Sequence, residues 1–434
     1  MFLYVLKDPA PSGSGYRLTI RGVVLSFINQ TPATNIAFQA SPRLKQPDFF
    51  LCFHQRFSKK RINDTLPQAM LENKEHFLHL WTLGFAPTLL QSYISRTKEF
   101  RDRNKERHSS FQRLIDATNT YLKDSGLTYH EFMENLLVKC EDVLYAWNTG
   151  MTFPSYTPCQ DLNITTYHHL PGGYCMKIEG KNQTGLIFGA ATSFELKIDP
   201  DSFYTTWRDS RLDGAQIMFP DVISQNNNKG YGYDFNADMI YLLPHHQNKI
   251  SIEKTELRMM KSHNYDCDDT PGYSQSACIA NCAMTELKLQ CLPLAMSEVI
   301  GHESDQRYAI FPKCGPLENE INFTFGLMSN NDVWIKCNQQ CILPCYKTFY
   351  KPSISYAEVS EDKLKTTDGY ANKHFMFIDI HYGHMTSTVI ANFNTMNIYG
   401  LVSNLGGNFG LWIGASIFSI VHCLTFWMCR SCTV

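Results

Sequence analysis

Apolar and polar positions first form a clear pattern near residue 47. The segment PDFFLCFHQRF from Pro47 contains a continuous apolar run that ends at Cys52, which predicts a strand. Residues 86–140 are instead rich in helix formers and charged residues, so we expect helices there. The charged run from Arg96 to Arg107 is most simply a solvated helix face. The first part of the chain is therefore expected to place a strand before a helical section.

The middle of the chain changes from a β-type pattern to a helical one. From Cys159 to about Leu257, short alternating runs such as Gly185 to Phe194 and Met239 to Leu243 are broken by Gly, Pro and Asn, which is typical of β-structure. A helical, cysteine-bearing section follows from Tyr273 to Lys347, and HFMFIDIHY from His374 then alternates like a strand. No internal repeat is evident. The order of these elements predicts an α+β fold with a β-rich core.

The last apolar stretch is long enough to cross a bilayer. LWIGASIFSIVHCLTFWMC, from Leu411 to Cys429, has nineteen residues without a formal charge, and a helix rises about 1.5 Å per residue. Arg430 follows it directly, which favours a cytoplasmic C-terminus and places the preceding domain outside the cell. Residues 1–30 contain neither a signal peptide nor a comparable span. We therefore expect one C-terminal transmembrane helix and no earlier membrane span.

Cysteines and sequons indicate an oxidising compartment. Twelve of the fifteen cysteines lie between Cys52 and Cys345, whereas Cys423, Cys429 and Cys432 lie at the C-terminal end. Sequons for N-glycosylation occur at Asn29, Asn63, Asn163, Asn182 and Asn322. Together they favour a disulfide-rich extracellular glycoprotein domain. The balance of 39 basic and 41 acidic residues gives no broad field of either sign, so no nucleic-acid partner is expected.

Cysteine spacing in the helical section predicts a ladder of disulfides. Cys278 and Cys282 are four residues apart, as are Cys337, Cys341 and Cys345, and this spacing puts thiols on one side of a helix. Two antiparallel limbs would then be laced by nested bonds: Cys267–Cys345, Cys278–Cys341, Cys282–Cys337 and Cys291–Cys314. Spacing alone leaves the connectivity open, because even six cysteines allow fifteen arrangements. A zinc site at Cys337, Cys341 and Cys345 is the competing interpretation, although structural zinc usually draws on paired Cys-x2-4-Cys motifs.

The C-terminal span carries more polar and small residues than a simple anchor needs. Ser416, Ser419, His422 and Thr425 interrupt an otherwise apolar helix, so some of them are expected to face protein or water. Gly406, Gly410 and Gly414 recur every four residues and share one helix face. Plain helix packing is the simpler explanation of those glycines taken alone.

These residues carry a resemblance to a known family. GLVSNLGGNFGLWIGASIFSIV, from Gly400 to Val421, closely resembles the pre-pore and pore segment of the epithelial sodium channel, degenerin and acid-sensing channel family, and Gly414-Ala415-Ser416 matches its Gly-x-Ser tripeptide. YSQSACIANC from Tyr273 and CILPCYKTFY from Cys341 resemble the segments that open and close the family's cysteine-rich thumb. PDFFLCF, CEDVLYAWNTG and GGYC continue the match in the same order.

The resemblance implies a fold, an assembly and roles for individual residues. It implies the disulfides Cys52–Cys175 and Cys140–Cys159, finger and thumb helices around a β-rich core, and a homo- or heterotrimer with two further subunits of the family. In that assembly, the last helix of each subunit lines a pore for sodium ions in the bilayer of the plasma membrane. The implied roles are a selectivity filter at Gly414, Ala415 and Ser416, a gating (degenerin) position at Gly400, an amiloride-type blocker position at Gly407, and pore-helix packing at Gly406 and Gly410. The simpler structural alternatives are that Gly400 only ends a strand and that Gly407 only eases helix packing.

Four segments follow for this chain. They are an atypical N-terminal segment (1–34), the extracellular domain (35–403), the pre-pore segment with the pore-lining helix (404–430) and a short cytoplasmic tail (431–434). His422 and Thr425 depart from the family pattern, because acidic residues commonly follow the tripeptide there; a histidine in the pore would respond to pH, and a histidine bonded to a neighbouring helix is the alternative.

The predicted function is that of a subunit of an amiloride-sensitive-type sodium channel, gated through its extracellular domain. The alternative is a non-conducting single-pass receptor or regulatory subunit, which would explain the sequons and disulfides equally well. We expect no enzyme, cofactor or metal site, because His54, His130, His245 and His246 lie in no recognisable nucleophile or metal arrangement.

Overall fold

The protein is described from a computed structural model of the 434-residue chain. The structure describes residues 32–53, 56–85, 105–149, 154–164, 167–170, 173–184, 192–198, 202–205, 215–223, 232–234, 239–261, 266–294, 312, 314–317, 319–321, 330–359, 374–394, 398–413 and 417–431. The chain divides into two compact units. One comprises residues 36–258 and 267–390, and the other comprises residues 1–35, 259–266 and 391–434.

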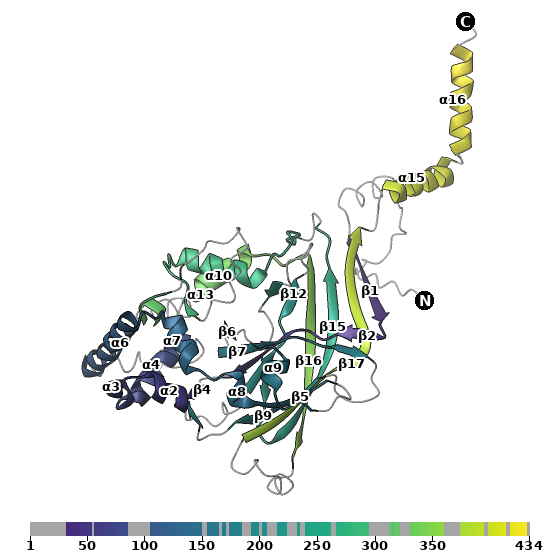
Figure 1. Cartoon of the computed structure of the whole chain (residues 1–434). Helices are drawn as coiled ribbons and strands as arrows, with labels where there is room; N and C mark the ends of the chain where they lie inside the picture. Colours follow the sequence, from purple (N-terminus) through teal and green to yellow (C-terminus); the bar gives the residue numbers. More distant parts are fainter. Residues whose placement is uncertain are drawn as a thin grey trace, which may run out of the picture. The chain divides into compact units, whose positions relative to one another are not determined.

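The largest element is an eight-stranded sheet in which neighbouring strands are mostly not consecutive in sequence (Figure 1). Its strands follow one another in the order β13 (Gly232–Asp234), β12 (Asp221–Ile223), β16 (Tyr346–Glu358), β15 (His246–Arg258), β17 (His374–Asn394), β9 (Thr192–Ile198) and β5 (Leu144–Asn148), and β1 (Pro32–Ala40) pairs with β17. β15 and β16 form its longest antiparallel pair, from His246 opposite Glu358 to Arg258 opposite Tyr346. This pair frames the cysteine-rich segment that joins the two strands.

A five-stranded sheet lies with the first one around a common core. Its order is β14 (Met239–Leu242), β11 (Ala215–Met218), β3 (Phe49–Phe53), β7 (Gly173–Ile178) and β6 (Tyr167–Leu170). Two short ribbons accompany it, β10 (Phe203–Thr205) with β4 (Arg56–Ser58), and β2 (Arg43–Lys45) with β8 (Asn182–Thr184).

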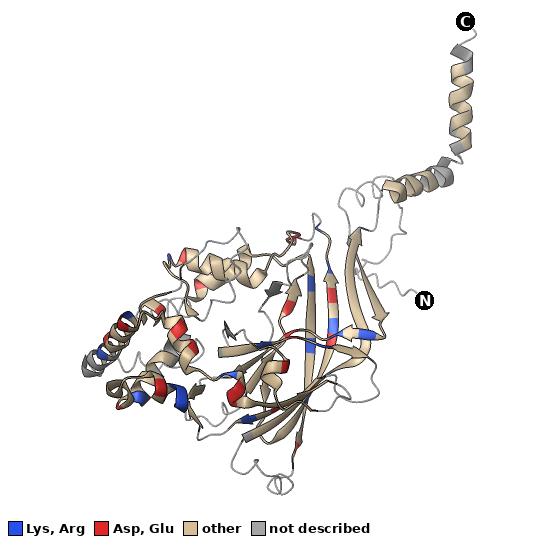
Figure 2. Ribbon diagram, viewed as in Figure 1, with Lys and Arg blue, Asp and Glu red and all other residues tan. Residues whose placement is uncertain are grey.

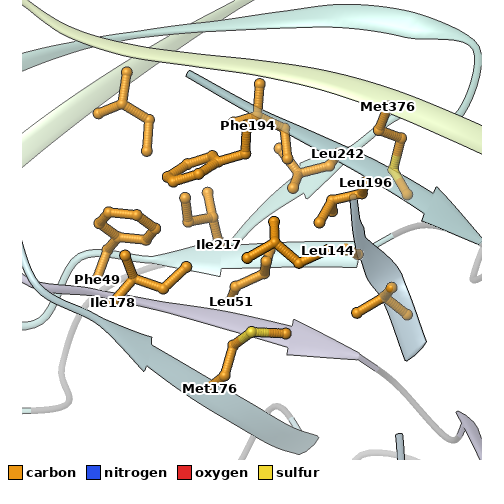
Figure 3. Packing of buried hydrophobic residues seen from close by; sticks show 14 of the residues in the cluster. Phe49, Leu51, Leu144, Met176, Ile178, Phe194, Leu196, Ile217, Leu242 and Met376 are labelled. Carbon is orange, nitrogen blue, oxygen red and sulfur yellow. The ribbon is translucent and has the colours of Figure 1, made fainter. Parts of the chain in front are cut away.

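The apolar run after Pro47 forms the buried strand β3. Phe49 and Leu51 pack into the main hydrophobic cluster, together with Phe194 of β9 and Ile217 of β11 (Figure 3). The alternate residues of β3, Phe50 and Cys52, belong to a second cluster with Cys175 and Met218. Because both faces of β3 are covered, its sequence is apolar throughout instead of alternating.

Helices gather into a separate cluster at one side of the sheets. They are α2 (Lys59–Thr65), α3 (Gln68–Leu71), α4 (Lys74–Phe85), α6 (Lys105–Ser125) and α7 (Tyr129–Leu136). Trp81 is fully buried at its centre, and its Nε1–H donates to Thr118 Oγ1 of α6 at 3.1 Å. Phe132 of α7 meets the Trp81 ring edge-on at 4.9 Å, and the Tyr129 hydroxyl donates to the Trp81 carbonyl at 2.8 Å. One tryptophan thus ties three helices together.

The remaining helices lie beside the sheets and at the C-terminal end. α8 (Cys140–Val143) and α9 (Pro158–Asp161) flank β5, and α10 (Gln275–Glu286) and α13 (Asn331–Gln340) belong to the cysteine-rich segment. α15 (Ile398–Ile413) and α16 (Ile417–Ser431) follow β17. Within the described parts of the chain, none of the helices has both the length and the apolar character needed to span a membrane.

The expected elements agree with the structure where it describes them. The strand after Pro47, the helices in residues 105–140, the β-rich middle and the strand from His374 are all present. Residues 86–104, with most of the charged run, and residues 185–191 of the expected run before Phe194 lie outside the described residues.

Candidate functional site

The cysteine-rich segment leaves the large sheet at the paired ends of β15 and β16. Arg258 and Tyr346 are opposite each other, so the two limbs of the segment start side by side. The Cys267–Cys345 disulfide closes this base, with 5.0 Å between the two Cα atoms. Backbone bonds reinforce it, because the Cys345 N–H donates to the Asp268 carbonyl at 2.7 Å and the Asp268 N–H donates to the Leu343 carbonyl at 2.9 Å. The segment is therefore clamped where it meets the sheet.

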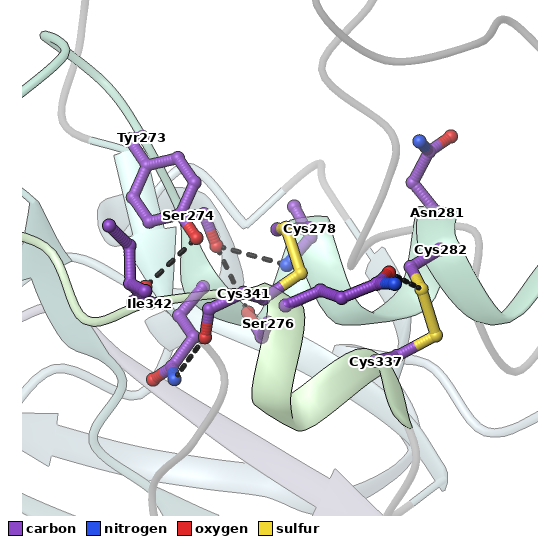
Figure 4. The surroundings of a disulfide bond; sticks show 12 residues. Tyr273, Ser274, Ser276, Cys278, Asn281, Cys282, Cys337, Cys341 and Ile342 are labelled. Atoms are coloured by element: carbon purple, nitrogen blue, oxygen red, sulfur yellow. Dashed lines mark hydrogen bonds between the residues drawn. A yellow bond between two sulfur atoms is a disulfide. The ribbon is translucent and has the colours of Figure 1, made fainter. Parts of the chain in front are cut away.

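Two further disulfides join α10 to the second limb (Figure 4). Cys278 and Cys282, one helical turn apart on α10, bond to Cys341 and Cys337, with Cα–Cα distances of 5.9 and 5.7 Å. α13 ends at Gln340, so Cys341 is its C-cap residue and only Cys337 lies within the helix. The ladder forms although the second limb is only partly helical.

Hydrogen bonds fix the first turn of α10 against this limb. Ser274 is the N-cap residue, and its hydroxyl accepts from the Ala277 N–H at 3.2 Å. The Tyr273 hydroxyl donates to the Ile342 carbonyl at 2.9 Å, and Gln275 Nε2 donates to the Cys341 carbonyl at 3.0 Å. The segment YSQSACIANC thus combines a helix cap, two contacts across the ladder and two disulfides.

Three more disulfides complete the set. Cys291 bonds to Cys314, Cys52 to Cys175 and Cys140 to Cys159. The six pairs are the same as those given above from cysteine spacing and from the family resemblance. The bonds also exclude the zinc interpretation of Cys337, Cys341 and Cys345, because none of the three is a free thiol. The described residues contain no other group of His, Cys, Asp and Glu suited to a metal ion.

The segment beyond Cys291 docks on the helix cluster through a buried carboxyl group. Glu320 has no exposed surface, and the Leu294 N–H donates to its Oε1. Its Oε2 lies 4.0 Å from Nε2 of His130, which is itself buried on α7. Burial raises the pKa of Glu320 well above its usual range, and the Leu294 hydrogen bond opposes this shift only partly. No sequence motif points to Glu320, and His130 lies in no recognisable nucleophile or metal arrangement of the sequence.

The predicted pore residues lie on α15 and α16 or between them. Gly414, Ala415 and Ser416, the expected filter, fall outside the described residues. Gly400, Gly406, Gly407 and Gly410 all lie on α15. Apart from the backbone of its own helix and its two chain neighbours, a Cβ atom added to Gly406 or Gly407 would meet no atom of the described residues within 4 Å. Contacts within the described chain therefore give no reason for glycine at these two positions.

α16 exposes apolar side chains around the whole helix, with a few polar residues among them. Phe418, Leu424 and Trp427 are 85%, 57% and 75% exposed. His422 and Thr425 are exposed as well. The Thr425 hydroxyl donates back into its own helix, to the carbonyls of Val421 and His422 at 2.9 and 3.0 Å. A hydroxyl bonded in this way tolerates an apolar environment, because its polar hydrogen already has an acceptor.

Three of the five sequons are described, and all three asparagines are exposed. Asn63 lies on α2, Asn182 on β8, and Asn163 in a turn with a positive φ of 48°. Asn29 and Asn322 fall outside the described residues.

Comparisons with known proteins agree on one family. The model of the amiloride-sensitive sodium channel family matches residues 19–426. The alpha subunit of the epithelial sodium channel of Mus musculus is 23% identical over 305 residues, or 61% of this chain and 40% of that protein. The bile acid-sensitive ion channel of Homo sapiens is 25% identical over 187 residues, or 38% of this chain and 35% of that protein. Degenerin del-1 of Caenorhabditis elegans is 30% identical over 100 residues, or 22% of this chain and 15% of that protein.

The matches thus span less than half the length of each of these relatives. Among solved structures, a proton-activated chloride channel aligns with 94% of this chain and 90% of its own, at 6% identity and a TM-score of 0.30, which carries no argument on the fold. The family is one of ion channels and not of enzymes. The family match covers nearly the whole chain, so this protein belongs to the amiloride-sensitive sodium channel family.

Proposed function

We propose that this chain is one subunit of a trimeric, sodium-preferring cation channel of the plasma membrane, with its disulfide-bonded domain outside the cell. α15, α16 and residues 414–416 between them would line the pore. The observation that carries the proposal is the exposed, uncharged C-terminal segment within the family match. No Asp, Glu, Lys or Arg occurs between Asp379 and Arg430, and Figure 2 shows neither charge colour on α15 or α16.

The two sides of α16 suit different surroundings. At 3.6 residues per turn, Ser419, His422 and Thr425 follow one side of the helix, and Phe418 and Phe426 share that side. Val421, Leu424 and Met428 follow another side, and all three are exposed within the chain. In an assembly of three subunits, the first side would face a water-filled axis and the second would face lipid or a neighbouring helix. A simple anchor in lipid gives no role to His422 on the first side.

The glycines of α15 support close contact between subunits. Gly406 and Gly407 have open space around them among the described residues, and a partner helix packed closely there would account for the absence of side chains. Three copies of α15 meeting there could approach closely, as small residues allow in membranes. Residues 414–416 would then offer hydroxyl and carbonyl oxygens that replace part of the hydration shell of a sodium ion.

Gating would act through β17. The strand runs from His374, within the large sheet, to Asn394, and α15 begins at Ile398. The cysteine-rich segment is clamped to the neighbouring strands β15 and β16, so a stimulus that moves it can pull on the same sheet. Such a stimulus would reach the pore helix along one continuous strand.

Current recordings test the proposal. The chain is expressed in oocytes, alone and together with alpha, beta and gamma subunits of the epithelial sodium channel, and surface protein is measured in parallel. Gly414→Leu is expected to abolish the sodium current carried by complexes that contain the chain, because a bulky side chain would close a filter of small residues. Gly315→Leu is the matched control, because it adds the same side chain where a Cβ atom meets nothing within 4 Å. A chain that reaches the surface and adds or changes no current in any combination would favour the non-conducting receptor.

A further inference from the structure

A pocket of about 180 Å³ lies between the large sheet and the connector that leads from β2 into β3. Its floor consists of Val222 of β12, Thr348 and Tyr350 of β16, and Lys254 of β15. Val222 is opposite Thr348 in the strand register, and Lys254 is opposite Tyr350. Opposite residues share a face of a sheet, as do alternate residues of one strand, so these four lie on the same face. It is the core face, because Tyr350 packs against the main hydrophobic cluster.

The facing wall is the connector itself, Lys45–Asp48, which is bonded to β17. Gln46 is buried, and its Nε2 donates to the Ile380 carbonyl at 2.8 Å. The Tyr382 hydroxyl donates to the Lys45 carbonyl at 2.7 Å. All of these residues belong to the larger unit. The pocket is therefore built by a single chain between two fixed walls.

Lys254 is the best-defined cation of the lining. Its ammonium group donates to Glu256 Oε1 at 2.8 Å, and Arg258 donates to the other oxygen of that carboxylate at 2.7 Å. An ammonium group has three N–H donors, so the bond to Glu256 leaves two for a further acceptor. The Thr348 hydroxyl adds a neutral donor to the floor, and Lys45 adds a second positive charge to the lining.

The acidic residues in and beside the pocket have cations of their own. Asp48 is the acidic residue of the lining, and its Oδ1 accepts from the Gly180 N–H at 3.0 Å while its Oδ2 lies 3.5 Å from Lys177 Nζ. Asp221, next to Val222, is paired with Lys347 at 2.5 Å. Of the charged residues named for this pocket, five are basic and three are acidic. The pocket thus favours a negatively charged ligand.

We propose that this pocket binds a small organic anion, with a carboxylate at Lys254 and the Thr348 hydroxyl and an apolar body against Val222 and the Tyr350 ring. Hydrogen bonds from an ammonium group to a carboxylate are about twice as strong as those between neutral groups. The volume of about 180 Å³ is smaller than the roughly 300–1,000 Å³ of pockets for drug-sized ligands, which limits the body to a few carbon atoms or one ring. A bare chloride ion would leave most of the pocket and its apolar floor unused.

The connector gives binding a route to the rest of the chain. Lys45 and Gln46 are bonded to Tyr382 and Ile380 of β17, the strand that leads to α15. An effect of the ligand on current rests on the proposed channel function, whereas binding itself does not. The two claims are therefore tested separately.

The test is calorimetry on the full chain in detergent, with sodium benzoate and sodium succinate as anionic probes. Benzamide and succinamide have the same bodies without the charge, and sodium chloride tests a bare inorganic anion. At least one carboxylate is expected to bind saturably, while its amide does not bind. Lys254→Gln should weaken binding at least tenfold, and Thr348→Val, which keeps the shape of the side chain and removes the hydroxyl, should weaken it several-fold.

Lys249→Gln is the matched control. It removes one positive charge from the same strand, at a residue that alternation places on the opposite face from Lys254 and that is not part of the lining. It should leave binding unchanged, and melting temperatures should show which variants fold. If Lys254→Gln does not fold, Thr348→Val decides.

The proposal is overturned if neither carboxylate binds, if a carboxylate and its amide bind alike, if chloride alone binds, or if the folded variants bind as the wild type does. A chain that binds a carboxylate and carries no current would overturn the channel function and leave this site in place. A chain that conducts and binds no carboxylate would overturn the site alone.

Discussion

Removal of the Cys282–Cys337 disulfide tests whether the cysteine-rich segment behaves as a nested ladder. The two cysteines are 55 residues apart. A bond closing that loop alone would stabilise the fold by about 4.2 kcal/mol through the entropy of the unfolded segment. The neighbouring Cys278–Cys341 bond spans 63 residues, however, and already closes a ring outside it. Because 63 − 55 = 8, the inner bond only divides that ring into parts of 55 and 8 residues.

The expected loss is correspondingly smaller. Dividing the ring in this way costs as much entropy as closing a loop of about 7 residues. With the same dependence of loop-closure entropy on loop length, the inner bond then stabilises the fold by about 2.4 kcal/mol. The double variant Cys282→Ala/Cys337→Ala should therefore open α10 and α13 about 60-fold more often, compared with about 1,000-fold for an isolated loop.

Hydrogen exchange with mass spectrometry on the full chain measures this opening directly. Peptides from α10 and α13 should exchange about 60-fold faster in the variant, while those from β15 and β17 keep their protection. The control Cys52→Ala/Cys175→Ala removes a bond outside the segment and should leave α10 and α13 unchanged. Acceleration close to 1,000-fold, or none at all, would refute the nested-ladder account.

Two further predictions concern stability. Gly180→Ala should lower the stability by about 3 kcal/mol or more, because the added Cβ atom would overlap the backbone oxygens of Gln46 and Pro47. The control is Gly315→Ala, whose Cβ atom has open space. Equal melting temperatures of the two variants would contradict this prediction. Glu320→Gln should remove a pH dependence. Since burial raises the pKa of Glu320, its contribution to stability is fully present below the unfolded pKa and is lost as pH rises through the folded pKa. Above about pH 4.5, the unfolding free energy of the wild type should thus fall relative to that of the variant, by up to about 1.4 kcal/mol per pH unit, and the melting temperature should fall with it. Parallel pH profiles of the two melting temperatures would contradict this prediction.

Local sequence signals predicted the parts of the fold that depend on neighbours in the chain. β3 was visible as an apolar run because both its faces are buried. The rungs from Cys278 and Cys282 followed from one turn of helix. The Cys52–Cys175 bond joins strands 123 residues apart, and only the family resemblance supplied it. The spacing of cysteines within one helix or strand does not indicate which distant strand lies beside it.

The residues that sequence reasoning missed depend on such distant neighbours. Asp379 is one polar position in an alternating strand, and nothing near it in the sequence identifies its hydrogen-bond partners. Its environment comes from Ser193 and Gln247, which the sheet brings from two other strands. Glu320 is similar, because its burial depends on contact with Leu294 and the helix that carries His130. Charged residues that lose solvent through tertiary contacts look ordinary in the sequence.

The C-terminal helices present the opposite case, in which the sequence pattern is clear and the single chain does not explain it. Gly406 and Gly407 have free space where a side chain would go, so glycine there only adds conformational freedom that folding must restrict. Phe418 and Trp427 expose most of their apolar surface, which is unfavourable in water. Both features become favourable at once if the helices pack against copies of themselves within lipid, since close packing then requires small residues and lipid accepts the apolar ones. An isolated anchor in lipid explains the aromatic residues and leaves the glycines unexplained, so we expect these helices to pack against partner helices in the membrane.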